Sequence, residues 1–133
     1  MQRIEILFGR KTDRGSFTIK ADESYFYGDQ DSILDQFSNL LAFAVKTVEA
    51  ETGIELSVEI VRSTTVVCTK DSTNETAKET FTVSSVRNPN VYGEIKQESW
   101  KLAFVKVAEF LKEELEQSNI VVDFCQTEFF AIA

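Results

Sequence analysis

The sequence predicts a single α+β domain over residues 1–133, with a mainly antiparallel sheet and two amphipathic helices packed on it. Apolar and polar residues alternate over 54–60, which is the period of a strand with one buried face. Apolar residues recur every three or four positions over 33–48 and 100–115, which is the period of a half-buried helix. The expected element order is ββ(β)αβββαβ, and two separated helices among long antiparallel stretches are typical of this class.

Size and composition are consistent with one compact unit. The chain has 133 residues, of which 43% are hydrophobic, and 11 of them are Phe. A chain of this length buries roughly two-thirds of the surface that it exposes when unfolded. The apolar content excludes a disordered chain. No apolar run approaches the roughly 20 residues that a membrane span requires, so we expect no membrane association.

The first part of the chain predicts a hairpin. Residues 3–8 and 16–20 both alternate in strand fashion, and the polar stretch 9–15 between them resembles a turn. Residues 24–28 are expected to add a short strand or a packed loop. The first helix should follow, with Ser32 as its N-cap and Gly53 ending it in a left-handed conformation.

The second half predicts three strands, a helix and a final strand region. Strands are expected over 54–61, 64–70 and 79–87, with a loop over 71–76 and a stop at Asn88-Pro89-Asn90. The long second helix should cover 94–117, with Asn119 capping its C-terminus. Strand-forming residues then return over 120–124 and 128–133. The apolar stripe of the second helix consists of Trp100, Ala103, Phe104, Val107, Leu111 and Leu115.

The charge is strongly negative and unevenly distributed. Fourteen Lys and Arg against 22 Asp and Glu give a formal net charge of -8. Residues 21–60 hold nine acidic side chains and one basic one. Direct nucleic-acid binding is disfavoured, because phosphate binding requires clustered cations. An acidic block favours a protein partner with a basic surface, although a solvated surface accounts for the same charges.

No residue pattern indicates catalysis. The chain has no histidine, and its 5 glycines are isolated rather than clustered into a phosphate-binding loop. Glu55 and Glu59 share a strand face, and Glu109, Glu113 and Glu116 share a helix face, but such positions are ordinarily solvated surface. We therefore predict that the protein is not an enzyme and has neither a cofactor nor a metal site.

The cysteines and the N-terminal sequence bear on the compartment. Cys68 and Cys125 lie far apart in strand-like segments and are expected to be buried free thiols. Residues 1–5 carry no apolar stretch of the kind found in a secretory signal. A reducing cytoplasm is the expected location.

An aromatic and acidic surface is the predicted partner-binding site. Aromatic anchors with a charged rim suit binding to a basic protein surface. The alternative is that Phe26 enters the core and the neighbouring tyrosines lie against the sheet. The predicted surface consists of Asp22, Glu23, Tyr25, Tyr27, Asp29 and Asp31.

The C-terminal residues indicate a second surface. Phe129 and Phe130 point to opposite faces in an extended strand, so both are dry only if that strand is covered on two sides. A homo-oligomer interface would provide this cover. The alternatives are a frayed end, or a helix that covers the second face.

Three functions fit these features, and we favour the first. It is a small acidic inhibitory protein, of the immunity-protein or phage anti-defence type, that blocks a basic site on a partner. The second is a structural or oligomeric subunit, such as a phage assembly component. The third is a small-molecule-binding domain, with the ligand held between sheet and helices.

Overall fold

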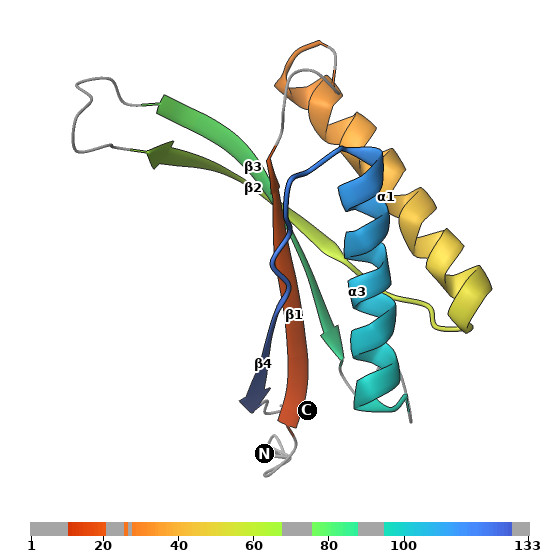
Figure 1. Ribbon diagram of the computed structural model, residues 1–133. Coiled ribbons are helices and arrows are strands. Elements are labelled where there is room, and N and C mark those ends of the chain that lie inside the picture. The colour runs from red at the N-terminus through yellow and green to blue at the C-terminus, as the bar shows by residue number, and fades with distance from the viewer. Residues whose placement is uncertain (1–10, 21–25, 27, 68–75, 88–94, 129–133) are drawn as a thin grey trace, which may run out of the picture.

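The computed structural model describes residues 11–20, 26, 28–67, 76–87 and 95–128. Four strands form one antiparallel sheet in the order β2-β3-β1-β4, and α1 and α3 lie side by side on one face of it (Figure 1). The predicted α+β class is confirmed, and the described elements occur in the order βαββαβ. Their bounds are β1 Lys11–Lys20, α1 Gln30–Thr52, β2 Glu59–Val67, β3 Thr76–Arg87, α3 Gln97–Glu114 and β4 Asp123–Glu128.

The core lies between the sheet and the two helices. The sheet contributes Phe17, Ile19, Phe81 and Val83, each at most 2% exposed. The apolar stripes of α1 and α3 pack against these side chains. Aromatic rings fill much of this layer: Phe37 of α1 stacks on Phe81 of β3 at 4.6 Å, and Phe17 of β1 lies 5.2 Å from Phe104 of α3. The predicted stripe of the second helix is buried throughout. Phe26 is also in the core, 6% exposed, with its ring against Phe37 and Phe81.

Helix α1 begins and ends at capping residues. Asp29, not Ser32, is the N-cap, because its carboxylate accepts a hydrogen bond of 2.9 Å from the Ser32 backbone N–H. The predicted cap was therefore wrong by three residues. Gly53 ends the helix with φ 74°, as predicted, and its N–H donates to the Glu49 carbonyl. An αL position of this kind favours glycine, which has no Cβ to clash.

Strand β1 corrects the predicted N-terminal hairpin. Residues 11–15, which we expected to form a turn, continue as strand into residues 16–20. Asp13 and Gly15 face the helices, where Arg87 and two aromatic rings occupy the inner side of the sheet. A Cβ on Gly15 would lie 2.9 Å from the rings of Phe104 and Phe124. The glycine therefore admits close ring packing within a strand and does not mark a turn.

The other strands are shifted from their predicted positions. Residues 59–61 and 64–67, which we expected in two strands, lie in one strand, β2, and its pairing with β3 begins at Glu59↔Ser84. Residues 54–58 precede β2 and are not part of a strand, although Leu56 is buried, 5% exposed, as the alternation predicted. A hydrogen bond of 2.8 Å from Ser85 Oγ to the Ser57 carbonyl links this stretch to β3. Strand β3 begins before the predicted 79–87, and β4 joins the two predicted C-terminal segments, overlapping the end of 120–124 and residue 128.

Several predictions fall outside the described residues. These are the strands over 3–8 and 128–133 (apart from residue 128), the segment 24–28 apart from Phe26 and Gly28, residues 68–70 of the strand over 64–70, the loop over 71–76 apart from Thr76, which begins β3, the stop at 88–90, and Cys68. Cys125 is described, and it is an exposed free thiol on β4, so its predicted burial was wrong. Neither α1 nor α3 combines the length and apolar character needed to cross a bilayer, in a search limited to the described residues.

Candidate functional site

The sheet opens beside the second half of β1. Strand β1 pairs with β3 as far as Lys20, whereas its pairing with β4 ends at Ser16↔Asp123. Residues 117–122, which lead from α3 into β4, run down alongside β1 (Figure 1). A cavity of about 420 Å³ lies between β1 and this segment. We call it the β1 cavity, and its volume is in the range of small-molecule sites, about 300–1,000 Å³.

Two chain segments form the walls of the β1 cavity. The sheet contributes Ser16, Phe17, Thr18, Lys20 and Thr80, and the segment after α3 contributes Gln117, Ser118, Asn119, Val121 and Asp123. Paired residues of an antiparallel ladder share a face, so Ser16, Thr18, Lys20 and Asp123 all lie on the sheet face away from the helices. Val121 is 65% exposed, which leaves an apolar surface available in a largely polar wall.

The end of α3 places the second wall. The helix finishes with paired bonds from Glu116 N–H to the Glu113 carbonyl and from Gln117 N–H to the Lys112 carbonyl, which is a Schellman motif. Glu116 takes the left-handed conformation, φ 47°, at the position where glycine is usual. The turn directs the chain to β1, where Gln117 Nε2 lies 3.4 Å from the Lys20 carbonyl oxygen. Asn119, our predicted C-terminal cap, lies beyond this turn in the cavity wall.

Opposite charges lie at the two ends of the β1 cavity. Asp123 is opposite Ser16, and Lys20 is four residues further along β1. At about 3.3 Å per residue, the two charged residues are attached roughly 13 Å apart. Both are exposed. Among the described residues, the ion pairs found are Arg87–Asp13 and Lys106–Glu51, so Lys20 and Asp123 are not neutralised by a described neighbour.

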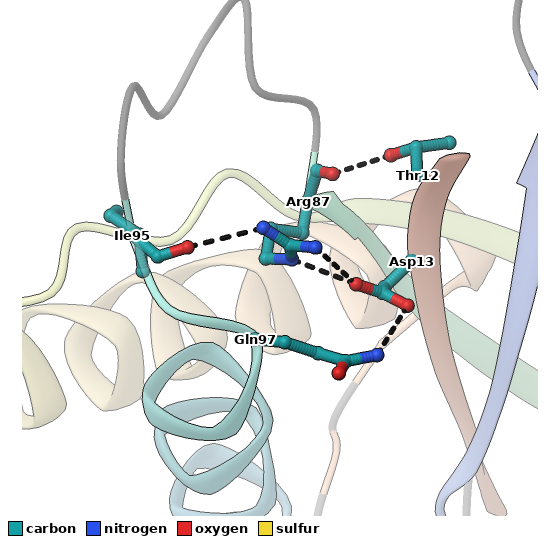
Figure 2. Close-up of polar contacts among 5 residues, drawn as sticks. All are labelled: Thr12, Asp13, Arg87, Ile95 and Gln97. Carbon is teal, nitrogen blue, oxygen red and sulfur yellow. Dashed lines mark hydrogen bonds and ion pairs between the residues drawn. The ribbon is translucent and has the colours of Figure 1, made fainter. Parts of the chain in front are cut away.

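A second polar cluster lies at the other end of β1. Figure 2 shows Asp13 held between Arg87 of β3 and Gln97 of α3. Arg87 Nη2 is 2.6 Å and Nε 2.8 Å from Asp13 Oδ2, and Gln97 Nε2 donates to Oδ1 at 2.8 Å. Arg87 also donates to the Ile95 carbonyl, and Thr12 Oγ1 donates to the Arg87 carbonyl. We call these five residues the Asp13 cluster.

The carboxylate of the Asp13 cluster is fully paired, although Asp13 and Gln97 also border a small cavity of about 130 Å³. Asp13 is 2% exposed, and both of its carboxylate oxygens already accept hydrogen bonds. Burial raises the pKa of Asp13, but hydrogen bonds from Arg87, Gln97 and Gln126 and the charge of Arg87 more than offset this, so its pKa lies below the usual value. A carboxylate held ionised and fully paired ties the start of α3 to the sheet. We therefore assign the cluster a structural role and take the larger β1 cavity as the candidate site.

Sequence reasoning did not identify the β1 cavity. Of the predicted partner-binding surface, Asp29 is the N-cap of α1 and Asp31 lies in the first turn of that helix. Asp22, Glu23, Tyr25 and Tyr27 lie outside the described residues, as do Phe129 and Phe130. The docking and oligomer roles of these residues therefore remain predictions. The one signal of the cavity in the sequence was the polar alternation over 16–20, which marks a solvated sheet face but no site.

Comparisons with known proteins identify a family. The family model described as SAM lyase matches residues 12–133. Among solved structures, a phage SAM lyase in the apo state superimposes with a TM-score of 0.60 at 9% identity, covering 100% of this chain and 95% of that one. A phage SAM lyase in complex with S-methyl-5'-thioadenosine gives a TM-score of 0.59 at 9% identity, covering 92% and 87%. These two likenesses establish a shared fold. A search of curated proteins found no match.

The family match corrects our functional prediction. We expected a protein that is not an enzyme and that inhibits a partner by covering a basic site. A lyase is an enzyme, and the matched region covers both helices and nearly all of the described sheet. The prediction failed because it took the lack of histidine and of a nucleophile–base pair as evidence against chemistry of any kind.

Proposed function

This chain belongs to the SAM lyase family, and from that membership we propose that it cleaves S-adenosylmethionine (SAM) in the β1 cavity. The family match over residues 12–133 is the observation that carries the proposal. The cavity supports it because its walls combine an exposed apolar side chain, hydroxyl and amide groups, and charges of both signs. SAM itself combines a flat base, a ribose diol, a sulfonium and an amino-acid end.

The substrate explains why no catalytic motif is present. The sulfonium of SAM is already a good leaving group, so no acid has to protonate it. A lyase breaks a bond without adding water, and release of S-methyl-5'-thioadenosine requires cleavage between sulfur and the γ-carbon of the methionine chain. That bond can break when the substrate's own carboxylate oxygen attacks the γ-carbon. The bonding electrons pass to sulfur, and the other product is a five-membered lactone.

This route needs no protein base, because no proton is gained or lost. An elimination would instead require a base to take a proton from the β-carbon, and a chain without histidine lacks the usual one. The protein's contribution is to hold the carboxylate close to the γ-carbon. We infer that the cavity walls perform this positioning.

Incubation of the purified chain with SAM tests the activity. Chromatography should detect methylthioadenosine and an equimolar four-carbon lactone. Val121→Arg places a long charged side chain in the cavity and should abolish turnover. Val61→Arg is the matched control, since Val61 is 55% exposed on β2 and should tolerate the same change. If wild-type protein leaves SAM intact, the proposed activity is wrong; if Val121→Arg retains full turnover, the location is wrong.

We place this activity in the cytoplasm, as part of a phage anti-defence function. SAM is the methyl donor and cofactor of many host enzymes, so its removal would affect those that depend on it. Expression of the chain in bacteria should lower the cellular SAM pool and raise methylthioadenosine. The Val121→Arg variant, expressed to the same level, should leave both metabolites unchanged.

A further inference from the structure

We propose that residues 117–122 form a strap that closes onto β1 by continuing the β1–β4 ladder, and that closure removes the β1 cavity. The structure shows the strap in its open position, with the cavity between it and β1. The strap opens and closes whatever molecule the cavity holds, so its motion does not depend on the proposed function. It is a conformational device that determines whether the cavity exists.

The strap contains strong strand-forming residues, yet it is not a strand. Ile120, Val121 and Val122 are β-branched and come directly before β4. We expected a strand from residue 120, whereas β4 begins at Asp123. A local preference that the fold does not satisfy is typical of a functional or strained segment. The sequence of the strap therefore favours a conformation other than the one in the structure.

The side chains of the strap already alternate as a longer ladder requires. Continuing the pairing beyond Ser16↔Asp123 places Val121 opposite Thr18. Thr18 lies on the sheet face away from the helices and Val121 is 65% exposed, so closure leaves both on the same face. The strap residues on either side of Val121 pack against the core, which is where the same register directs them: these are Ile120 and Val122. Closure therefore moves no side chain to the opposite face.

The edge of β1 that faces the strap has backbone groups available for pairing. Bonded and non-bonded pairs alternate along an antiparallel ladder, and Ser16↔Asp123 is the last pair of β1 with β4. The Lys20 carbonyl faces the strap, because it accepts a hydrogen bond from Gln117 Nε2 at 3.4 Å. Thr18, midway between Ser16 and Lys20, directs its backbone groups to the same side. Among the residues that the structure describes, no backbone hydrogen bond joins the strap to β1.

The strap is held at both ends and is longer than the distance it covers. One end continues into the ladder at Asp123, and the other is held at Lys20 by the Gln117 side chain. The six steps from Gln117 to Asp123 reach about 20 Å when extended, whereas β1 covers roughly 13 Å from Ser16 to Lys20. The excess length lets the middle of the strap stand away from β1, where the cavity lies. Closure takes up this excess at the turn after α3.

Disulfide trapping tests closure. In a chain with Cys68→Ser and Cys125→Ser, the pair Thr18→Cys and Val121→Cys should cross-link within one chain, since opposite Cα atoms of a closed ladder lie about 5.5 Å apart. The matched control is Thr18→Cys with Asn119→Cys, which are out of register. Under mild oxidation, the in-register pair should cross-link at least about tenfold faster than the control. Non-reducing gels and mass spectrometry distinguish bonds within a chain from bonds between chains.

Hydrogen exchange tests the register. A closed ladder pairs the Lys20 N–H with the Asn119 carbonyl, so oxidation of the in-register pair should slow exchange of the Lys20 amide by at least about tenfold. The reference pair is Ser16→Cys with Asp123→Cys, which the structure already places opposite each other. Its oxidation should leave exchange of the Lys20 amide unchanged.

Each contrary outcome overturns the proposal. Equal cross-linking of the in-register and control pairs, or cross-linking of neither, would mean that the strap does not close. A cross-link that leaves the Lys20 amide unprotected would mean that the strap approaches β1 without forming the ladder. Relaxation dispersion of the wild-type chain avoids any effect of substitution on folding. It should detect microsecond-to-millisecond exchange at Ile120 and Val121, and its absence there would contradict closure.

Discussion

The two ends of β1 differ in whether their charged residues are buried and paired. At one end, Asp13 and Arg87 are 2.6 Å apart, and Asp13 is 2% exposed. At the other end, Lys20 and Asp123 lie on the same sheet face but at opposite ends of a cavity. Strand β1 therefore contributes Asp13 to a closed pair with β3 and, seven residues later, Lys20 to an open arrangement with β4.

The difference shows how to separate stability from function in this fold. A buried charge without its partner destabilises the folded state, so breaking the closed pair should reduce stability. Exposed charges contribute little to stability, so the open pair is available to a ligand. The substitutions below test whether the Asp13 end affects folding and the Lys20 end affects binding.

Asp13→Ala is expected to have the largest effect on folding. The Arg87 side chain is 19% exposed and would lose its carboxylate, and Gln97 would lose its acceptor. We expect the free energy of unfolding to fall by about 3 kcal/mol, measured by urea denaturation. Asp35→Ala, at an exposed site on α1, should change it by about 0.5 kcal/mol or less. Equal effects of the two variants would refute the structural role of the cluster.

Gly15→Ala should have the next largest effect. The added Cβ would lie 2.9 Å from the rings of Phe104 and Phe124, closer than a Cβ normally approaches another atom. We expect a loss of about 2 kcal/mol in the free energy of unfolding. Adding Phe124→Leu should make the glycine substitution less costly, as a double-mutant cycle would show. Strict additivity of the two changes would contradict the packing described for β1.

The pH dependence of unfolding should reveal the Asp13 cluster. The pKa of Asp13 lies below its ordinary value of 3.8, so its ionised form stabilises the folded state. This contribution is complete above pH 3.8 and is lost as the pH falls through the lower, folded-state pKa. Stability of the wild-type chain should therefore decline more steeply in acid than that of Asp13→Asn. Parallel acid profiles would mean that the pair does not contribute to stability.

Local patterns predicted the helices well. The stripe from Trp100 to Leu115 and the αL end at Gly53 depend on residues close in sequence, and both are confirmed. The strand at 11–15 was mistaken for a turn because its inner face is completed by Arg87, 74 residues after Asp13. No local period reports a partner at that distance.

The site was harder to predict than the fold. The β1 cavity exists because β4 separates from β1 at Ser16, and this depends on where the turn after α3 directs the chain. The sequence near Ser16 does not encode that separation. The proposed cleavage also predicts no motif, since a substrate that supplied its own nucleophile and leaving group would need no paired catalytic residues.

Lys20→Met and Asp123→Asn should have the smallest effects on folding and large effects on function. Both residues are exposed, and neither forms an ion pair with a described residue, so each change should alter the free energy of unfolding by about 0.5 kcal/mol or less. Each should nevertheless lower the SAM cleavage rate at subsaturating substrate by about tenfold. Urea denaturation and turnover, measured on the same preparations, would show the two effects together. A stability loss comparable to that of Asp13→Ala would mean that both ends of β1 serve the fold, and the contrast between them would disappear.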